Sequence, residues 1–112
     1  PLYLPQAKSY DGAAALGPCL LLTEDAPGPE TAIRLKILRD GQPIFTDETS
    51  LAKMKRNFEE LVGFLYRETS FPEGAFLMTG TGIVPGNDFT LHSGDEIRIS
   101  IDGIGTLANP VE

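Results

Sequence analysis

The clearest pattern along the chain is an alternation of apolar and polar residues over positions 32–39. Three aliphatic side chains face one way there and two cationic side chains face the other. Asp40-Gly41 follows, a dipeptide favoured in two-residue turns because both positions need a positive φ. Residues 43–46 then predict a returning strand. Because proline has no backbone N–H, that strand is expected either to lie at a sheet edge or to begin at Pro43. The pattern predicts a β-hairpin.

A second alternating segment covers residues 96–102 and carries three isoleucines on one side. Gly103-Ile104-Gly105 predicts a turn, and residues 106–109 predict a returning final strand. Shorter apolar runs bounded by Gly, Pro or polar residues predict further extended pieces at residues 2–4, 19–23, 75–78 and 89–91.

Residues 51–68 have the spacing of a helix with one apolar stripe, which is expected to face the core. Thr49 or Ser50 is expected to cap its N-terminus, and the Pro and Gly of residues 70–74 are expected to end it. The expected fold class is therefore mostly β (α+β), with one long amphipathic helix. The stripe consists of Leu51, Met54, Phe58, Leu61, Val62 and Leu65.

Length, composition and charge exclude several classes of protein. A length of 112 residues corresponds to one domain or part of one, and a hydrophobic content of 41% excludes a disordered chain. The net charge of −7 excludes the basic face of a nucleic-acid binder and argues against binding to anionic membranes. The one basic cluster, at residues 53–56, is followed at once by two glutamates. No apolar run could span a membrane and no signal peptide is recognisable, so a cytoplasmic location is expected.

The chain has one cysteine and one histidine, which leaves little room for catalysis or metal binding by these residue types. Cys19 lies in an apolar run and is expected to be a buried thiol rather than a nucleophile. His92 lies where a strand is expected to end and is expected at the surface. No metal-ligand spacing or paired-carboxylate site is defined by the residues alone.

Two weaker signals remain. Residues 79–82, Thr-Gly-Thr-Gly, follow an expected strand, but Pro85 disfavours the helix that a phosphate or dinucleotide loop requires. This segment is therefore either a tight bend or a loop that offers backbone N–H groups and hydroxyls to an anion. Lys8 lies among small, mostly uncharged residues and is either a surface lysine or a cation that stabilises a carboxylate or enolate.

Both signals belong to a series of segments that runs through nearly the whole chain. The segments are Gln6-Ala7-Lys8-Ser9-Tyr10-Asp11, Ala15-Leu16-Gly17-Pro18, Leu77-Met78-Thr79-Gly80-Thr81-Gly82-Ile83-Val84, Ser93-Gly94-Asp95-Glu96 and Ile101-Asp102-Gly103-Ile104-Gly105-Thr106-Leu107-Ala108-Asn109-Pro110-Val111. The series resembles the C-terminal part of the fumarylacetoacetate hydrolase superfamily catalytic domain, with its Lys-Ser-Phe-Asp, Pro-Leu-Gly-Pro, Thr-Gly-Thr-Pro and Gly-Ile-Gly-Thr-Leu-x-Asn-x-Val motifs. Gly82 stands where many members have Pro. This departure and residues 1–8 most resemble the branch that contains 2-keto-3-deoxy-D-arabinonate dehydratase.

The resemblance implies that the chain is part of a mixed β-roll and that the enzyme uses Mg²⁺ or Mn²⁺ to act on a small 2-oxo acid. It also implies a homodimer, or pairing with a missing N-terminal part. Lys8 would be the catalytic cation and would stabilise negative charge that develops on the substrate. Thr81, Gly80 and Gln6 would contact the substrate, and Asp11 and Thr79 would support these residues.

The family's metal-binding carboxylates, a Glu-x-Glu pair and a further acid, precede its Lys-Ser-Phe-Asp motif. Only seven residues precede Lys8 and none of them is Asp or Glu, so no metal site is expected within this chain. Residues 1–112 are therefore expected to be the C-terminal portion of the catalytic domain of a longer enzyme, or an inactive remnant. The missing initial Met favours the fragment, which alone is expected to be inactive.

The reaction type stays open, because hydrolysis, dehydration, isomerisation and decarboxylation can all pass through related enolate-like intermediates. The alternative function is a non-catalytic β module that binds a partner or has lost its metal site. A tautomerase that uses Pro1 as its base is disfavoured, because those folds repeat a β-α-β unit and this sequence has one expected helix and no repeat.

Overall fold

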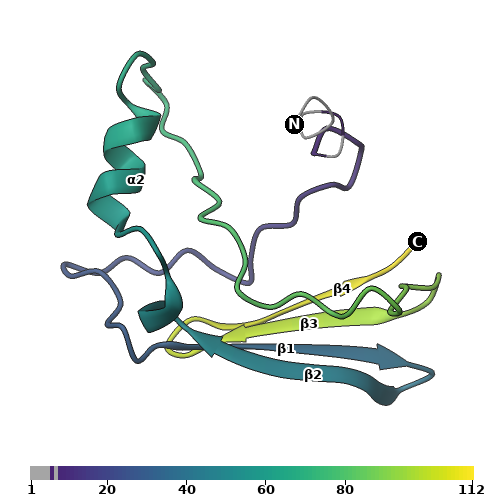
Figure 1. The fold of residues 1–112 in the computed structure, drawn as a ribbon. Helices are drawn as coiled ribbons and strands as arrows, with labels where there is room; N and C mark the ends of the chain where they lie inside the picture. The colour runs from purple at the N-terminus through teal and green to yellow at the C-terminus, as the bar shows by residue number, and fades with distance from the viewer. Residues whose placement is uncertain (1–5, 7) are drawn as a thin grey trace.

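The computed structural model describes residues 6 and 8–112, so Pro1 and the extended piece expected at residues 2–4 lie outside the described residues. Within these described residues, four strands form one sheet, and the α-helix of residues 58–65 stands apart from it (Figure 1). The elements are β1 (Ala32–Arg39), β2 (Gln42–Ser50), a 3₁₀ helix (Leu51–Lys53), α2 (Phe58–Leu65), β3 (Glu96–Ile101) and β4 (Gly105–Pro110).

The sheet has the order β2-β1-β3-β4, and every neighbouring pair is antiparallel. Both predicted strand pairs are confirmed, and β2 runs further than expected, to Ser50. Asp40 and Gly41 have φ values of 51° and 74°, as their turn requires. Pro43 lies near the start of β2, which is an edge strand, so its missing N–H interrupts no central ladder. The expectation of a mostly β fold is correct.

The long helix expected over residues 51–68 is wrong. The chain forms a short 3₁₀ helix, then an extended residue at Met54, and α2 begins only at Phe58. The backbone breaks at Met54, whose ψ of 128° is extended, and Asn57 caps a new helix start. The backbone N–H of Leu51 donates to the Thr31 carbonyl at 3.1 Å, and that of Ala52 donates to the Pro29 carbonyl at 2.8 Å. These bonds fix the first turn against the loop before β1. The expected cap at Ser50 makes no side-chain hydrogen bond.

Asn57 provides the N-cap of α2, because its side-chain oxygen accepts a hydrogen bond from the Glu60 backbone N–H at 2.7 Å. Two glutamates in the first turn also oppose the helix dipole favourably. No residue of α2 is fully buried, so the apolar stripe does not form a closed core face among the described residues.

Replacing Asn57 with alanine should destabilise the α2 segment by about 1 kcal/mol, because it removes the acceptor for one free helix N–H. Asn57→Asp keeps an acceptor oxygen and should retain most of the stability. Hydrogen exchange of the α2 amides measures the difference. Equal exchange rates in the alanine and aspartate variants would contradict the capping role.

The extended pieces expected at residues 19–23, 75–78 and 89–91 do not pair with any strand in the described part of the chain. These segments run as irregular chain, and their large apolar side chains stay in contact with solvent, including Leu22, Phe76 and Met78. The solvent-accessible surface is 9092 Å², whereas a compact folded protein of 12.1 kDa exposes about 6,000 Å². The chain therefore buries less surface than its size allows.

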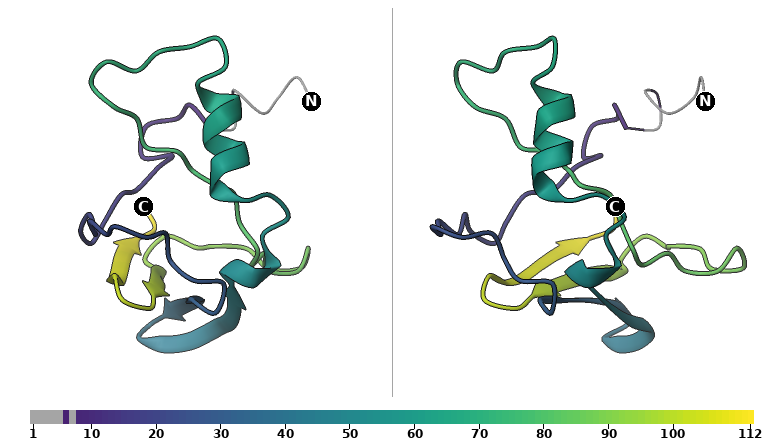
Figure 2. Two further views of the ribbon diagram at one scale, coloured as in Figure 1. Left: turned by 90° about the vertical axis from the view of Figure 1, so that its left-hand side faces the viewer. Right: turned by 60° about the vertical axis from the view of Figure 1, so that its left-hand side comes forward.

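In all three views, α2 and the irregular segments stand on one side of the sheet and leave its other side open (Figures 1 and 2). Buried apolar side chains are few in the described residues: Ala32, Ile37 and Ile83. None of the helices in this part of the chain is long and apolar enough to cross a membrane.

Asp95 ties the turn before β3 to the far end of β1. Its side chain is 1% exposed. The two carboxylate oxygens accept bonds from Nε and Nη2 of Arg39, both at 2.8 Å, and one also accepts from the His92 backbone N–H at 2.8 Å. The Arg39 bond, followed by the His92 bond, holds the pKa of Asp95 well below its usual range. His92 itself is exposed, as predicted.

Candidate functional site

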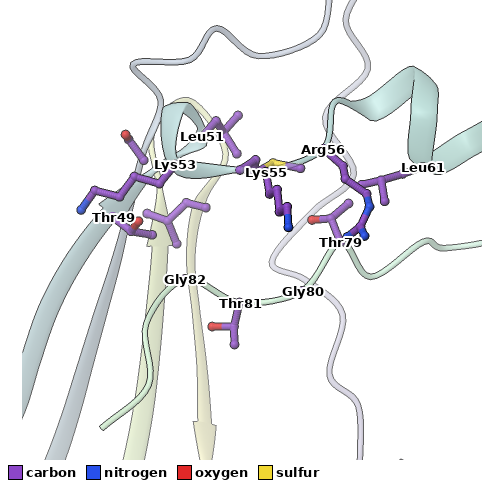
Figure 3. Close-up of a pocket in the computed structure, with 13 residues that line it drawn as sticks. Thr49, Leu51, Lys53, Lys55, Arg56, Leu61, Thr79, Gly80, Thr81 and Gly82 are labelled. Carbon is purple, nitrogen blue, oxygen red and sulfur yellow. The ribbon is translucent and has the colours of Figure 1, made fainter.

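The segment Thr79–Gly82 faces the turn that joins β2 to α2, and a pocket of about 290 Å³ lies between them (Figure 3). Residues 49–51 at the end of β2 form one wall, and residues 53–56 with Leu61 form another. The loop is the facing wall. The lining residues are Ile33, Thr49, Ser50, Leu51, Lys53, Met54, Lys55, Arg56, Leu61, Thr79, Gly80, Thr81 and Gly82.

The loop itself is a tight bend. The Thr81 hydroxyl donates to the Ile83 carbonyl at 3.0 Å and accepts from the Ile83 N–H at 3.3 Å. Gly80 has a φ of 98°, and a Cβ there would meet nothing within 4 Å, so glycine is needed for the backbone conformation rather than for space. The bend places Ile83 among the buried residues.

Gly82 lies directly against Thr49. A Cβ at position 82 would approach the Thr49 Oγ1 at 3.2 Å and its Cγ2 at 3.4 Å, so a larger residue would have to displace the β2 side chain. Thr49 is 8% exposed, and its Oγ1 has no hydrogen-bond partner in the described residues. The Thr49 hydroxyl is therefore a buried polar group whose hydrogen-bonding capacity is unsatisfied in the described residues.

The pocket lining is cationic. It contains Lys53, Lys55 and Arg56 and no carboxylate. In Figure 3 the Lys55 side chain points toward the loop at Gly80, and the Arg56 guanidinium lies beside Thr79. The Thr81 side chain points away from these cations. The arrangement can attract a negatively charged group into the pocket.

The N-terminal candidate residues are not brought to this pocket. Gln6, Lys8 and Asp11 are exposed, and none of them lines it. Their segment stands well away from the sheet, on the side that carries α2 (Figure 1). The structure thus brings together Thr79, Gly80 and Thr81 of the expected site residues, but leaves the expected catalytic lysine apart from them.

Two other motif segments do meet. Pro18 lies against Gly105, since a Cβ at position 105 would be 3.2 Å from the Pro18 Cγ. The Cys19 Sγ is 3.5 Å from the Ile104 carbonyl oxygen. Cys19 is exposed, so the expectation of a buried thiol is wrong. Its apolar neighbours Leu20, Leu21 and Leu22 are exposed too, because no strand pairs with this segment.

Sequence reasoning missed the pocket's cationic wall, because a continuous helix over residues 51–68 leaves no separate turn at residues 53–56. The signal was nevertheless present: Asn57 is a strong N-cap residue, and a helix that begins there leaves the three cations in the preceding turn. Thr49 carried no such signal, since its neighbour Gly82 is far away in sequence.

Among the described residues, no group of three or more His, Cys, Asp or Glu side chains is arranged to hold a metal ion. Hard cations such as Mg²⁺ need several converging oxygen ligands. The side chains described here therefore do not fit a complete magnesium site.

Comparison with known proteins shows the family to which the chain belongs. The family described as "Fumarylacetoacetate (FAA) hydrolase C-terminal" matches residues 2–112. A probable 2-keto-3-deoxyxylonate dehydratase of Haloferax volcanii is 46% identical over 99% of this chain, which spans 39% of that protein. A 2-dehydro-3-deoxy-D-arabinonate dehydratase of Saccharolobus solfataricus is 42% identical over 100% of this chain and 38% of its own length.

A solved structure of 2-keto-3-deoxy-D-arabinonate dehydratase complexed with magnesium and 2,5-dioxopentanoate has a TM-score of 0.93 and 42% identity. The match covers 99% of this chain and 40% of that one. The chain thus spans about two fifths of the length of these relatives. The chain belongs to the fumarylacetoacetate hydrolase family, whose C-terminal region it matches from residue 2 to residue 112.

Proposed function

We propose that this chain is the C-terminal portion of the catalytic domain of a magnesium-dependent dehydratase that acts on a 2-keto-3-deoxy sugar acid. The observation that carries the proposal is the 42% identity and TM-score of 0.93, over 99% of the chain, to a dehydratase complexed with magnesium and 2,5-dioxopentanoate. That ligand is a 2-oxo acid. It differs from a 2-keto-3-deoxypentonate by the loss of one water molecule. Dehydration of such a sugar acid would therefore yield this compound.

Within this proposal, Lys8 supplies a fixed positive charge beside the oxygen on which negative charge develops. Gln6, Gly80 and Thr81 contact the substrate, while Asp11 and Thr79 hold these residues in place. Gly80 has no side chain and open space beside its Cα, so a ligand can approach its backbone closely, and this supports the proposed contact. The arrangement requires the segment of residues 6–11 to lie against the 79–82 loop in the working enzyme.

Magnesium, with manganese as the alternative, is proposed to be held by carboxylates outside this chain, since the described residues offer no cluster for it. Large apolar side chains are exposed on the unpaired segments 19–23 and 75–78. This exposure supports the proposal that these segments are buried against the rest of a β-roll or against a second copy in a homodimer.

The test is an activity assay on the protein as its gene encodes it. Incubation of 2-keto-3-deoxy-D-arabinonate or 2-keto-3-deoxy-D-xylonate with Mg²⁺ should yield 2,5-dioxopentanoate, measured through its new aldehyde group. A sample in which Mg²⁺ has been chelated should be inactive and should recover when the metal is restored. A folded protein that converts none of a panel of 2-oxo acids would overturn the proposal and favour a non-catalytic β module.

A further inference from the structure

The 79–82 loop rests on the sheet through a contact between Gly82 and Thr49. The three atoms nearest to a Cβ at position 82 would all belong to the Thr49 side chain: Oγ1 at 3.2 Å, Cγ2 at 3.4 Å and Cβ at 3.7 Å. A Cβ at Gly80 would meet nothing within 4 Å. Of the two loop glycines, only Gly82 therefore makes room for a neighbouring side chain.

The residues on either side of Gly82 are tied to each other. The Thr81 hydroxyl donates to the Ile83 carbonyl at 3.0 Å and accepts from the Ile83 N–H at 3.3 Å, so a displacement of Gly82 carries Thr81 with it. Within residues 6 and 8–112, no hydrogen bond joins residues 79–82 to another segment of the chain. The position of the bend on the sheet therefore depends on packing.

Thr49 supports the loop from a fixed point of the sheet. It is the next-to-last residue of β2 and pairs with Ile33 of β1. Its side chain is buried, and its hydroxyl has no partner in the described residues. The hydroxyl therefore neither reaches a ligand nor bonds the loop, and what Gly82 meets is the shape of a stiff β-branched side chain.

We propose that Thr49 is a positioning residue for the 79–82 loop: its side chain sets the distance between Gly82 and β2, and thereby the place of Thr81. This inference rests on the proposed function, in which Gly80 and Thr81 contact the substrate. Thr49 lies on one side of the loop and the Thr81 side chain points to the other (Figure 3). Thr49 itself touches no substrate and acts only through the loop backbone.

Steady-state kinetics of the protein as its gene encodes it, with Mg²⁺ and a 2-keto-3-deoxy sugar acid, give the first test. Thr49→Ala removes the two atoms closest to Gly82 and should raise KM about tenfold, the loss expected when one hydrogen bond to a charged group is weakened. Because that bond is made equally in the bound substrate and the transition state, kcat should change much less. Thr46→Ala is the matched control, since Thr46 is an exposed threonine of β2 outside the pocket, and its KM should equal the wild type.

Thr49→Val distinguishes the shape of the side chain from its hydroxyl. Valine keeps the β-branched outline and removes only an unbonded buried hydroxyl, so KM should stay at the wild-type value and the melting temperature should not fall. An unchanged KM in Thr49→Ala, or a KM raised equally in Thr49→Val, would overturn the packing role.

Gly82→Ala tests the same contact from the loop. Gly82 is not among the glycines with a positive φ, so space rather than backbone conformation limits an alanine there. Its Cβ would meet the Thr49 Oγ1 at 3.2 Å, so the loop has to move and KM should rise. When Thr49→Ala is combined with Gly82→Ala, only the 3.7 Å approach to the Cβ of residue 49 remains, and KM should return toward the wild type. Additive defects in the double variant would contradict the contact.

Crystal structures of the wild type, Thr49→Ala and Thr49→Val separate this inference from the proposed function. The Thr81 Cα should be displaced relative to β2 in Thr49→Ala, by on the order of 1 Å, and should stay in place in Thr49→Val. A loop displaced in this way in a protein that converts no 2-oxo acid would support the positioning by Thr49 and overturn only the proposed function. An undisplaced loop in Thr49→Ala would overturn the inference whatever the activity.

Discussion

Replacing Lys8 with alanine should lower kcat of the intact enzyme by on the order of 10²–10³. The reason is that a fixed cation beside a developing oxyanion stabilises the transition state more than the bound substrate. KM should change much less, because the ground-state substrate carries little of that charge. The melting temperature should stay close to the wild type, since Lys8 is exposed and packs into no apolar cluster. Steady-state kinetics with Mg²⁺ and a 2-keto-3-deoxy sugar acid measure both parameters.

Lys36→Ala is the control for a general effect of removing one positive charge. Lys36 is also an exposed lysine, but it lies on β1 in the sheet, whereas the segment that carries Lys8 stands away from the sheet. Its kcat should remain at the wild-type value. A Lys8→Ala enzyme with unchanged kcat would show that Lys8 is a surface lysine, and an altered melting temperature would indicate a structural role instead.

Asp95→Asn should lower the melting temperature by on the order of 10 °C. The substitution leaves the Arg39 guanidinium without its paired carboxylate and weakens the bond from the His92 N–H. Asp25→Asn is the matched control, because Asp25 lies exposed in the loop before β1 and should change the melting temperature little. Thermal unfolding of the two variants and the wild type at neutral pH measures the difference. Equal melting temperatures would show that the Arg39 pair does not stabilise the fold.

Acid should reduce the difference between wild type and Asp95→Asn. The pKa of Asp95 is depressed in the folded state, mainly by the Arg39 bond. Its contribution is therefore fully present above the unfolded-state value of about 3.9 and is lost as the pH falls further, toward the folded-state pKa. The gap in unfolding free energy should be constant from about pH 6 to 8 and should shrink below about pH 4. A gap that widens in acid would contradict this sign.

Local chemistry determined the sheet. Alternation over residues 32–39 and 96–102 places apolar side chains on one side of each strand, and this period needs no distant partner to be recognised. The Asp40-Gly41 turn fixes the pairing of β1 with β2 within a few residues. The series of motifs likewise identified the family, because it depends on order along the chain alone.

Tertiary contacts decided what the sequence did not. The chain breaks at the extended residue Met54 and starts a new helix at the Asn57 cap, and the apolar spacing of residues 51–65 does not reveal this break. The bonds from Leu51 and Ala52 hold the first turn against the loop before β1. The expected short strands stay unpaired because a strand needs a neighbour, and none reaches them among the described residues. The pocket forms because Thr49 packs against Gly82 and the turn of residues 53–56, which carries three cations, faces Thr79. Its walls come from segments far apart in sequence, so only folding could bring their charges and donors together.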